Sequence, residues 1–435
     1  MCSSDLELPA WFYFVHASTK LMAPIKHAAS TPDEAPDVRP IGAGECLGRA
    51  IYRSVITDFK PALANHLFPQ QVAIGVEGGI SKLVFAIRLL AESNPDWVVV
   101  KIELRNAFDE ITKAIVLARL NADPALRSLV PMVWAVSSPA SPVFLAACDL
   151  TQAPFRSEEG MRQGDAAASA AFCVGIHPEV QALDAELAAS GGAARFDMDD
   201  GHAVGHPDVV FPAILAFAER VAHVGLELQL HKCTYYSVAG DMSVHPARPR
   251  NLNPGSIQLQ SGAVGYGLDV AGVPVGDDIY VAATLDCKAE ESMSKITTIT
   301  SQLRDHHLQS LHAIIVYCLA PMFHYWIQHC DPRLTAAAAQ RVDQALVAAA
   351  TVCYGPGVAS DPFAARRLRL PARRYGGGLR RLVDVAPAAF VGTLCRTVPT
   401  FTDSIDAQGG LQQGFLPALR SEEHTSELQS PDHLV

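Results

Sequence analysis

The sequence lacks an uninterrupted run of 18 apolar residues, which argues against a membrane-spanning helix. Its most apolar stretch, residues 313–327, is interrupted by Pro321 and His324. No basic stretch followed by an apolar core stands at the N-terminus, so we expect no signal peptide. The ten cysteines include no Cys-x-x-Cys pair, which favours reduced thiols. We therefore expect an intracellular protein of the nucleus or cytoplasm that is not secreted and has no membrane partner.

The chain also lacks positive net charge, with a formal value of −11 at pH 7. Residues 420–435 read like a translated sequencing-adapter oligonucleotide, and we set them aside as an artefact. Residues 421–435 contain four acidic residues and no lysine or arginine, so removing residues 421–435 leaves a formal net charge of −7. Basic residues gather instead at 366–381, where seven arginines fall within sixteen residues. Net charge therefore neither supports nor excludes a polyanionic partner.

The hydrophobic content of 49% indicates a folded globular protein, and 435 residues leave room for about two to four core-bearing units. A helix over 107–120 is expected to be capped by Asn106. The patterning predicts further helices over 46–59, 80–92, 165–189 and 209–224, strands over 97–104 and 226–230, and a helical bundle over 286–350. An antiparallel sheet backed by helices, the α+β class, fits this order of elements.

Two adjacent carboxylates, Asp199 and Asp200, precede Gly201 between short apolar segments. Asp-Gly in this setting predicts a hairpin turn that carries both carboxylates at its tip, although such turns are more often merely solvated. Glu103 adds a third carboxylate at the end of the strand 97–104. Phosphoryl transfer to a growing nucleic acid uses two divalent cations roughly 3.5–4 Å apart, held by carboxylates. The three residues predict a site for two Mg²⁺ ions, with Mn²⁺ as a substitute.

At these residues the chain resembles the reverse transcriptase domain of the non-LTR (LINE-like) retrotransposon type, from about Arg39 to Gly378. Seven segments in the family's order carry the resemblance: Arg39–Ile41 (fingers), Lys101–Phe108 (first palm motif), Glu159–Asp165, Asp197–Asp200 (aromatic-x-Asp-Asp), Gly225–Lys232, Gly272–Gly276 (primer grip) and Leu370–Leu379 (Gly-rich, after the thumb). The resemblance implies a right-hand polymerase whose palm is an antiparallel sheet of ferredoxin-like topology, with helical fingers and a helical thumb.

The resemblance also implies boundaries and roles. The expected segments are an irregular N-terminal segment (1–37), fingers (38–96), palm (97–283), thumb (284–360), an Arg/Gly-rich region (361–419) and the adapter-derived tail (420–435). The implied activity is RNA-directed DNA polymerisation, with an RNA template, a DNA primer and deoxynucleoside triphosphates as partners. Glu103, Asp199 and Asp200 are the implied catalytic and metal-binding residues. The implied nucleotide-binding residues are Arg39, Phe108, Gln163, Gly164 and Lys232.

Three positions depart from the family pattern. Glu103 stands where the family has aspartate, Asp197 replaces the aromatic residue, and Ala166 replaces a proline. These departures suggest a decayed copy, so the alternative is an inactive reverse-transcriptase-like remnant that only binds nucleic acid. A third interpretation is an RNA-dependent RNA polymerase or a nucleotidyl cyclase on a similar palm. A cyclase fits poorly, because it has neither a thumb nor a segment like Gln163–Gly164.

Overall fold

The computed structural model describes residues 18–22, 24–27, 37–137, 142–145, 155–304, 307–402, 404–405, 411–412 and 414–416. The expected tail at 420–435 lies outside them. The chain forms two compact units, one from residues 1–79 and 102–233 and the other from 80–101 and 234–435. Neither unit is a continuous stretch of sequence. The expected boundaries between fingers, palm and thumb stay a prediction.

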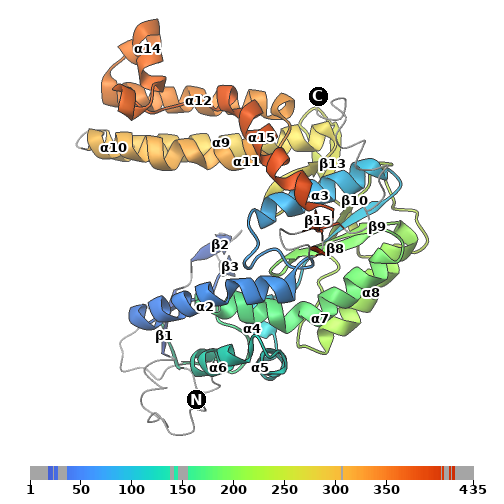
Figure 1. Cartoon of the computed structure of the whole chain (residues 1–435). Coiled ribbons are helices and arrows are strands. Elements are labelled where there is room, and N and C mark those ends of the chain that lie inside the picture. Colours follow the sequence, from blue (N-terminus) through green and yellow to red (C-terminus); the bar gives the residue numbers. More distant parts are fainter. Residues whose placement is uncertain are drawn as a thin grey trace, which may run out of the picture. The chain divides into compact units, whose positions relative to one another are not determined.

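The helices of the first unit gather around α7, which is apolar on nearly all its faces and therefore buried. Helices α2, α5 and α8 and strand β8 contact it, and α7 and α8 lie side by side in Figure 1. The helices are α2 (Cys46–Leu67), α4 (Ala107–Glu110), α5 (Lys113–Ala122), η1 (Arg127–Leu129), α6 (Val130–Ser137), α7 (Ala168–Ala188) and α8 (Pro207–Ala222).

The strands of the first unit form a small sheet and two hairpins. The sheet has the order β4-β1-β6-β7, with β1 antiparallel to β4 and parallel to β6. The strands are β1 (Thr19–Met22), β2 (Ile25–His27), β3 (Asp37–Val38), β4 (Ile41–Gly44), β6 (Pro142–Leu145), β7 (Phe155–Arg156), β8 (Ala193–Asp197) and β9 (Asp200–Gly205). The expectation of an irregular segment over 1–37 is wrong at β1 and β2, which pair with strands further along the chain.

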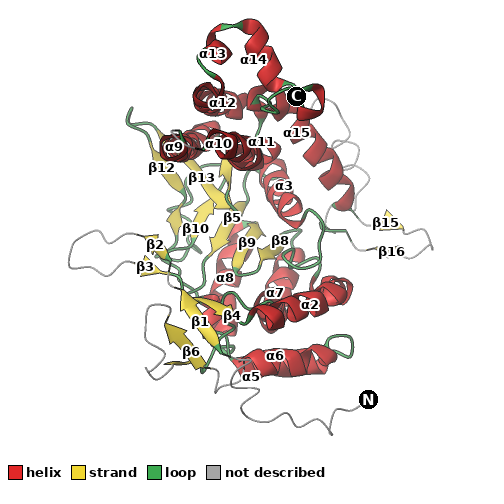
Figure 2. Cartoon of the chain, turned by 90° about the vertical axis from the view of Figure 1, so that its left-hand side faces the viewer, coloured by secondary structure: helices red, strands yellow, loops and turns green. Residues whose placement is uncertain are grey.

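The second unit combines a helical bundle with strand pairs that are antiparallel, except for the parallel pair of β10 and β11. Strands β12 and β13 contact α9 and lie below it in the view of Figure 2. Helix α9 packs against α12 through ion pairs from Arg341 to Asp286 (3.1 Å) and Glu290. Its strands are β5 (Val98–Ile102), β10 (Thr234–Tyr236), β11 (Asn253–Pro254), β12 (Ser256–Gln258), β13 (Val264–Val270), β14 (Val273–Gly276), β15 (Ser404–Ile405) and β16 (Leu411–Gln412). Its helices are α3 (Gly79–Ser93), α9 (Asp278–Leu303), α10 (Leu308–Ile314), η2 (Ile315–Leu319), η3 (Ala320–Phe323), α11 (His324–His329), α12 (Pro332–Tyr354), α13 (Gly357–Ser360), α14 (Pro362–Arg369), η4 (Ala372–Arg374), α15 (Leu382–Thr397) and η5 (Val398–Thr400).

Most predicted elements are confirmed, but two are wrong for a shared reason. The helix expected over 107–120 breaks at Ile111–Thr112, where the Thr112 amide donates to the Val224 carbonyl (2.9 Å) instead of continuing the helix. Asn106 adopts a left-handed conformation and its side chain makes no capping bond. The strand expected over 226–230 is reduced to one bridge between Leu228 and Leu104. Both departures come from the segment after α8 packing against residues 103–112.

Two stretches of the second unit, Leu308–His329 and Leu382–Thr400, are long and apolar enough to cross a membrane, by length and composition alone. The core helices of soluble proteins satisfy the same criterion. The expectations of no transmembrane segment and of an intracellular location therefore stay predictions.

Candidate active site

A hairpin tip carries three carboxylates, the candidates Asp199 and Asp200 and their neighbour Asp197. Asp197 pairs directly with Asp200 across β8 and β9, so the turn itself holds Met198 and Asp199. Met198 has a φ of 60°, whereas Asp199 has no positive φ, which is the pattern of a type II′ turn. All four side chains are half-buried. The tip thus presents two carboxylates at the strand ends and one in the turn.

The turn lies two residues earlier than the Asp-Gly signal predicts. Gly201 is inside β9, opposite Phe196 on β8. A β-carbon on Gly201 would lie 2.2 Å from the Phe196 ring, so any side chain there would displace that buried ring. The glycine is therefore required for packing, and the predicted turn position was wrong although the hairpin itself is confirmed.

Gln71, which the sequence analysis did not identify, holds the turn in place. Its fully buried side chain donates to the Met198 carbonyl (2.8 Å) and accepts from the Met198 amide (3.0 Å). The neighbouring Val72 amide donates to the Phe196 carbonyl (2.9 Å). Nothing in the local sequence marks this glutamine, because its partner lies 127 residues further along.

The charges of Glu103 and Arg39 act on the carboxylates of this hairpin. Burial raises the pKa of Asp199, and the charges of Glu103 and Asp197 raise it further, while a backbone hydrogen bond and the Arg39 guanidinium lower it. Burial and the charge of Asp200 raise the pKa of Asp197. The structure therefore brings residues 39, 103, 197, 199 and 200 into one charged neighbourhood within the first unit. Its excess of negative charge is only partly compensated.

The backbone of Glu103 is fixed by the segment that follows α8. Glu103 comes directly after β5 and is half-buried. Its carbonyl accepts from the Gln229 amide (2.9 Å), and its amide donates to the Cys233 thiol (3.3 Å). Lys232 precedes this cysteine and is exposed. Lys232 is thus anchored next to the partner of Glu103, but no ion pair joins it to a carboxylate in the part of the chain that the structure describes.

The Gln163–Gly164 turn docks on the strand that follows Arg39. The Gly42 amide of β4 donates to the Gln163 carbonyl (2.7 Å). Gly164 has a φ of 105°, and a β-carbon there would lie 2.3 Å from the Gly42 oxygen. Both the positive φ and the short distance to the Gly42 oxygen therefore require glycine at position 164. Two motifs more than 100 residues apart in sequence are therefore adjacent, with the exposed Arg39 leading into the shared strand.

Phe108 packs on α7, the helix that also contacts strands β8 and β9. Its half-buried ring stacks on Phe172, with centroids 4.5 Å apart and planes inclined by 20°. The next residue, Cys173, is fully buried, and its pKa is raised by burial and by the charges of Asp197 and Asp199. Phe108 thus packs on the α7 residue that directly precedes Cys173, whose pKa the charges of Asp197 and Asp199 raise.

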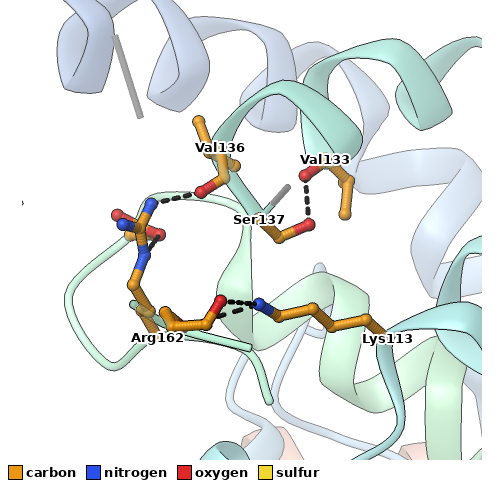
Figure 3. A network of polar contacts seen from close by, with 7 residues as sticks. Lys113, Val133, Val136, Ser137 and Arg162 are labelled. Carbon is orange, nitrogen blue, oxygen red and sulfur yellow. Dashed lines mark hydrogen bonds and ion pairs between the residues drawn. The ribbon is translucent and has the colours of Figure 1, made fainter. Parts of the chain in front are cut away.

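A buried polar network, also unforeseen from the sequence, supports the Gln163–Gly164 turn (Figure 3). Lys113 is 5% exposed and donates to the Ser157 carbonyl (2.6 Å), while Arg162 pairs with Asp165 (3.0 Å) and donates to the Val136 carbonyl. Burial and the nearby Arg162 charge lower the pKa of Lys113 to about 8. From the sequence alone, a lysine at the start of a helix is expected to be exposed to solvent. The burial of Lys113 is therefore visible only in the tertiary structure.

The donor chemistry of the carboxylate cluster suits a hard divalent cation, because every candidate ligand is a carboxylate oxygen. Among the residues that the structure describes, however, no three His, Cys, Asp or Glu side chains are arranged closely enough to hold a metal ion. The metal assignment therefore stays a prediction.

No protein-family model and no curated protein matches the sequence. Among solved structures, the chain is similar to apo telomerase from Candida tropicalis lacking its C-terminal domain, with 10% identity, a TM-score of 0.42, and coverage of 62% of this chain and 56% of that one. It is also similar to apo telomerase from Candida tropicalis, with 8% identity, a TM-score of 0.48, and coverage of 90% of this chain and 68% of that one. A third similar structure is telomerase from Candida albicans in complex with a TWJ fragment of telomeric RNA, with 8% identity, a TM-score of 0.40, and coverage of 91% of this chain and 64% of that one. The chain spans just over half of the first of these. Sequence identities of 8–10% and TM-scores below 0.5 do not assign the chain to a family.

Proposed function

We propose that the chain is a nucleotidyltransferase, an RNA-directed DNA polymerase of the non-LTR retrotransposon type. The supporting observation is that the charge of Glu103, from a strand end, raises the pKa of Asp199, which lies on a hairpin nearly 100 residues later beside Asp197. Half-buried carboxylates that raise one another's pKa values repel one another when ionised, and this repulsion destabilises the folded state. Such an arrangement is typical of a site that binds divalent cations or positions charge for catalysis.

In this proposal Glu103, Asp199 and Asp200 hold two Mg²⁺ ions, for which Mn²⁺ can substitute. When bound, the ions supply activation of the primer 3′-hydroxyl and neutralise charge on the leaving pyrophosphate. Arg39 and Lys232 provide positive charge for the triphosphate, and the Gln163–Gly164 turn lines the nucleotide. No side chain need act as an acid or base, because positioning and charge supply most of the rate.

A primer-extension assay tests this proposal against the inactive alternative. An oligo-dT primer on a poly-rA template is incubated with the folded protein, dTTP and either Mg²⁺ or Mn²⁺. Extension with either ion supports the polymerase. Absence of extension with both ions, from protein whose melting transition is cooperative, would instead favour a remnant that only binds nucleic acid.

Replacing Glu103 by Asp is expected to raise the extension rate. The shorter side chain withdraws the carboxylate by roughly 1 Å, a displacement worth about 10²-fold in rate when it restores productive geometry. Initial rates under saturating dTTP provide the measurement, and Glu103→Gln, which removes the charge, should lose activity. A Glu103→Asp rate at or below that of the unmodified protein would show that this residue does not limit catalysis.

Replacing Phe108 by Ala is expected to admit ribonucleotides. In this proposal the Phe108 ring, which stacks on Phe172, lies beneath the nucleotide's ribose and excludes a 2′-hydroxyl, the group that distinguishes RNA from DNA precursors. The ratio of dNTP to rNTP incorporation should fall by about tenfold, while dNTP use falls only modestly. Tyr317→Ala, an exposed aromatic of the second unit, is the control. Equal use of dNTPs and rNTPs by the unmodified protein would point to an RNA polymerase instead.

A further inference from the structure

The most basic part of the chain lies on α14 and the loop that follows it. Residues 362–381 contain seven arginines and no acid, although the whole chain has a formal charge of −11. Six of these arginines are exposed, and only Arg381 is half-buried. Figure 1 shows α14 projecting beyond the end of α12. Positive charge is therefore concentrated on one protruding element of the second unit.

Two exposed aromatic rings stand among these arginines. Phe363 is 75% exposed and Tyr375 is 86% exposed. Phe363 lies three and four residues before Arg366 and Arg367, so the three share one face of α14. The Arg367 guanidinium donates to the Tyr375 carbonyl (3.2 Å), which brings the backbone that carries the second ring beside that face. We call these three residues, with Arg373, Arg374 and Tyr375, the α14 surface.

The loop that carries Tyr375 is folded back and held in place. The amides of Gly377 and Gly378 donate to the carbonyls of Arg367 (3.2 Å) and Leu370 (2.9 Å). A β-carbon on Gly376 would lie 2.1 Å from the Leu370 oxygen, so the close packing requires glycine. The surface is thus built on a defined backbone rather than on a loose loop.

Tyr375 itself occupies an unfavourable conformation. Its φ is 59°, in the left-handed region that bulky residues rarely adopt. Its ring is in solvent, so core packing does not explain the residue type. Backbone strain of this kind persists where a side chain serves a function.

We propose that the α14 surface binds single-stranded nucleic acid, with the arginines contacting phosphates and the rings of Phe363 and Tyr375 stacking on unpaired bases. Exposed aromatic rings have no access to the bases of a duplex, whereas single strands combine stacking with phosphate contacts. Among the described residues, no ion pair engages Arg366, Arg373 or Arg374, so their charges are available. The binding needs neither nucleotide nor metal and is therefore distinct from the proposed nucleotidyl transfer.

The first test separates stacking from folding. Fluorescence anisotropy with a labelled oligo-dT strand of about 20 nucleotides, in EDTA and without dNTPs, measures binding by the full chain. Tyr375→Asn should weaken binding about tenfold, and Tyr375→Phe should bind like the unmodified protein. Because Asn tolerates left-handed conformations, Tyr375→Asn should melt at the same or a higher temperature. Unchanged binding by this stable variant would refute the stacking role.

The second test measures phosphate contacts. Arg373→Gln with Arg374→Gln should reduce the slope of log affinity against log salt concentration by about 1.4, since each contact to a single strand contributes about 0.7. Arg127→Gln with Arg250→Gln removes the same charge from exposed positions elsewhere and should leave the slope unchanged. Equal slopes for the two double variants would contradict the proposal.

A competition experiment decides the kind of partner. Unlabelled single strands should displace the probe at lower concentration than duplex of the same length. Equal competition by duplex, or stronger competition by vesicles containing anionic lipid, would overturn the assignment to single-stranded nucleic acid.

Discussion

Replacing Asp199 by Asn is expected to lower nucleotidyl transfer by about 10³-fold and, at the same time, to stabilise the fold at neutral pH. The loss of activity follows from removing a carboxylate at the centre of the proposed metal site. The gain in stability follows from the raised pKa of Asp199, since burial and the charges of Glu103 and Asp197 disfavour its ionised form. Opposite changes in activity and stability are typical of functional residues.

The pH dependence of unfolding checks the same idea. In the folded state the pKa values of Asp197 and Asp199 lie above their unfolded values. At a pH between the unfolded and the folded pKa, the folded protein therefore binds more protons than the unfolded protein. The free energy of unfolding should therefore fall as pH rises through this window and level off above it. The Asp199→Asn variant should show a shallower fall.

Thermal melts across the acidic range, with and without Mg²⁺, provide the measurement. Mg²⁺ should raise the melting temperature of the unmodified protein and have less effect on Asp199→Asn, because ligands that bind only the folded state stabilise it. Asp58→Asn, which changes an exposed carboxylate on α2, is the matched control. It should change neither the pH dependence of the melting temperature nor the effect of Mg²⁺ on it. Full extension activity in Asp199→Asn would remove the basis of the catalytic assignment.

Replacing Asp184 by Ala is expected to destabilise the first unit by about 3–5 kcal/mol. Asp184 on α7 accepts from the Arg195 guanidinium (2.6 Å), the Ala194 amide (2.9 Å) and the Gln70 side chain (2.7 Å). Arg195 on β8 is only 2% exposed, so replacing Asp184 removes the carboxylate that pairs with a buried guanidinium. The same contacts join β8, and hence the carboxylate hairpin, to α7.

Chemical denaturation of three variants tests this expectation. The double variant Asp184→Leu with Arg195→Met removes both charges and should recover much of the loss, because no unpaired charge remains. Glu186→Ala breaks the half-exposed pair with Arg220 and should cost no more than about 1 kcal/mol. A loss from Asp184→Ala as small as that from Glu186→Ala would show that the buried pair does not anchor the hairpin.

The sequence by itself determined the elements whose stability is local or whose apolar pattern is long. Helices α3, α7 and α8 and strand β5 lie where periodicity predicts them, and the bundle expected over 286–350 contains α9 and α12. The existence of the hairpin with Asp199 and Asp200 was also predictable, because short apolar segments flank it. These features depend on neighbours within a few residues, which a sequence pattern records.

Tertiary structure alone decided how the site is held. The hairpin turns at Met198–Asp199 rather than at Asp-Gly because Gly201 must accommodate the Phe196 ring and Gln71 binds the turn backbone. The helix after Glu103 breaks because the Val224 carbonyl competes for an amide. Each cause lies about 100 residues away in sequence or in a close packing contact. Local sequence patterns therefore indicate the candidate carboxylates, whereas the contacts that hold the hairpin and Glu103 in place are visible only in the folded chain.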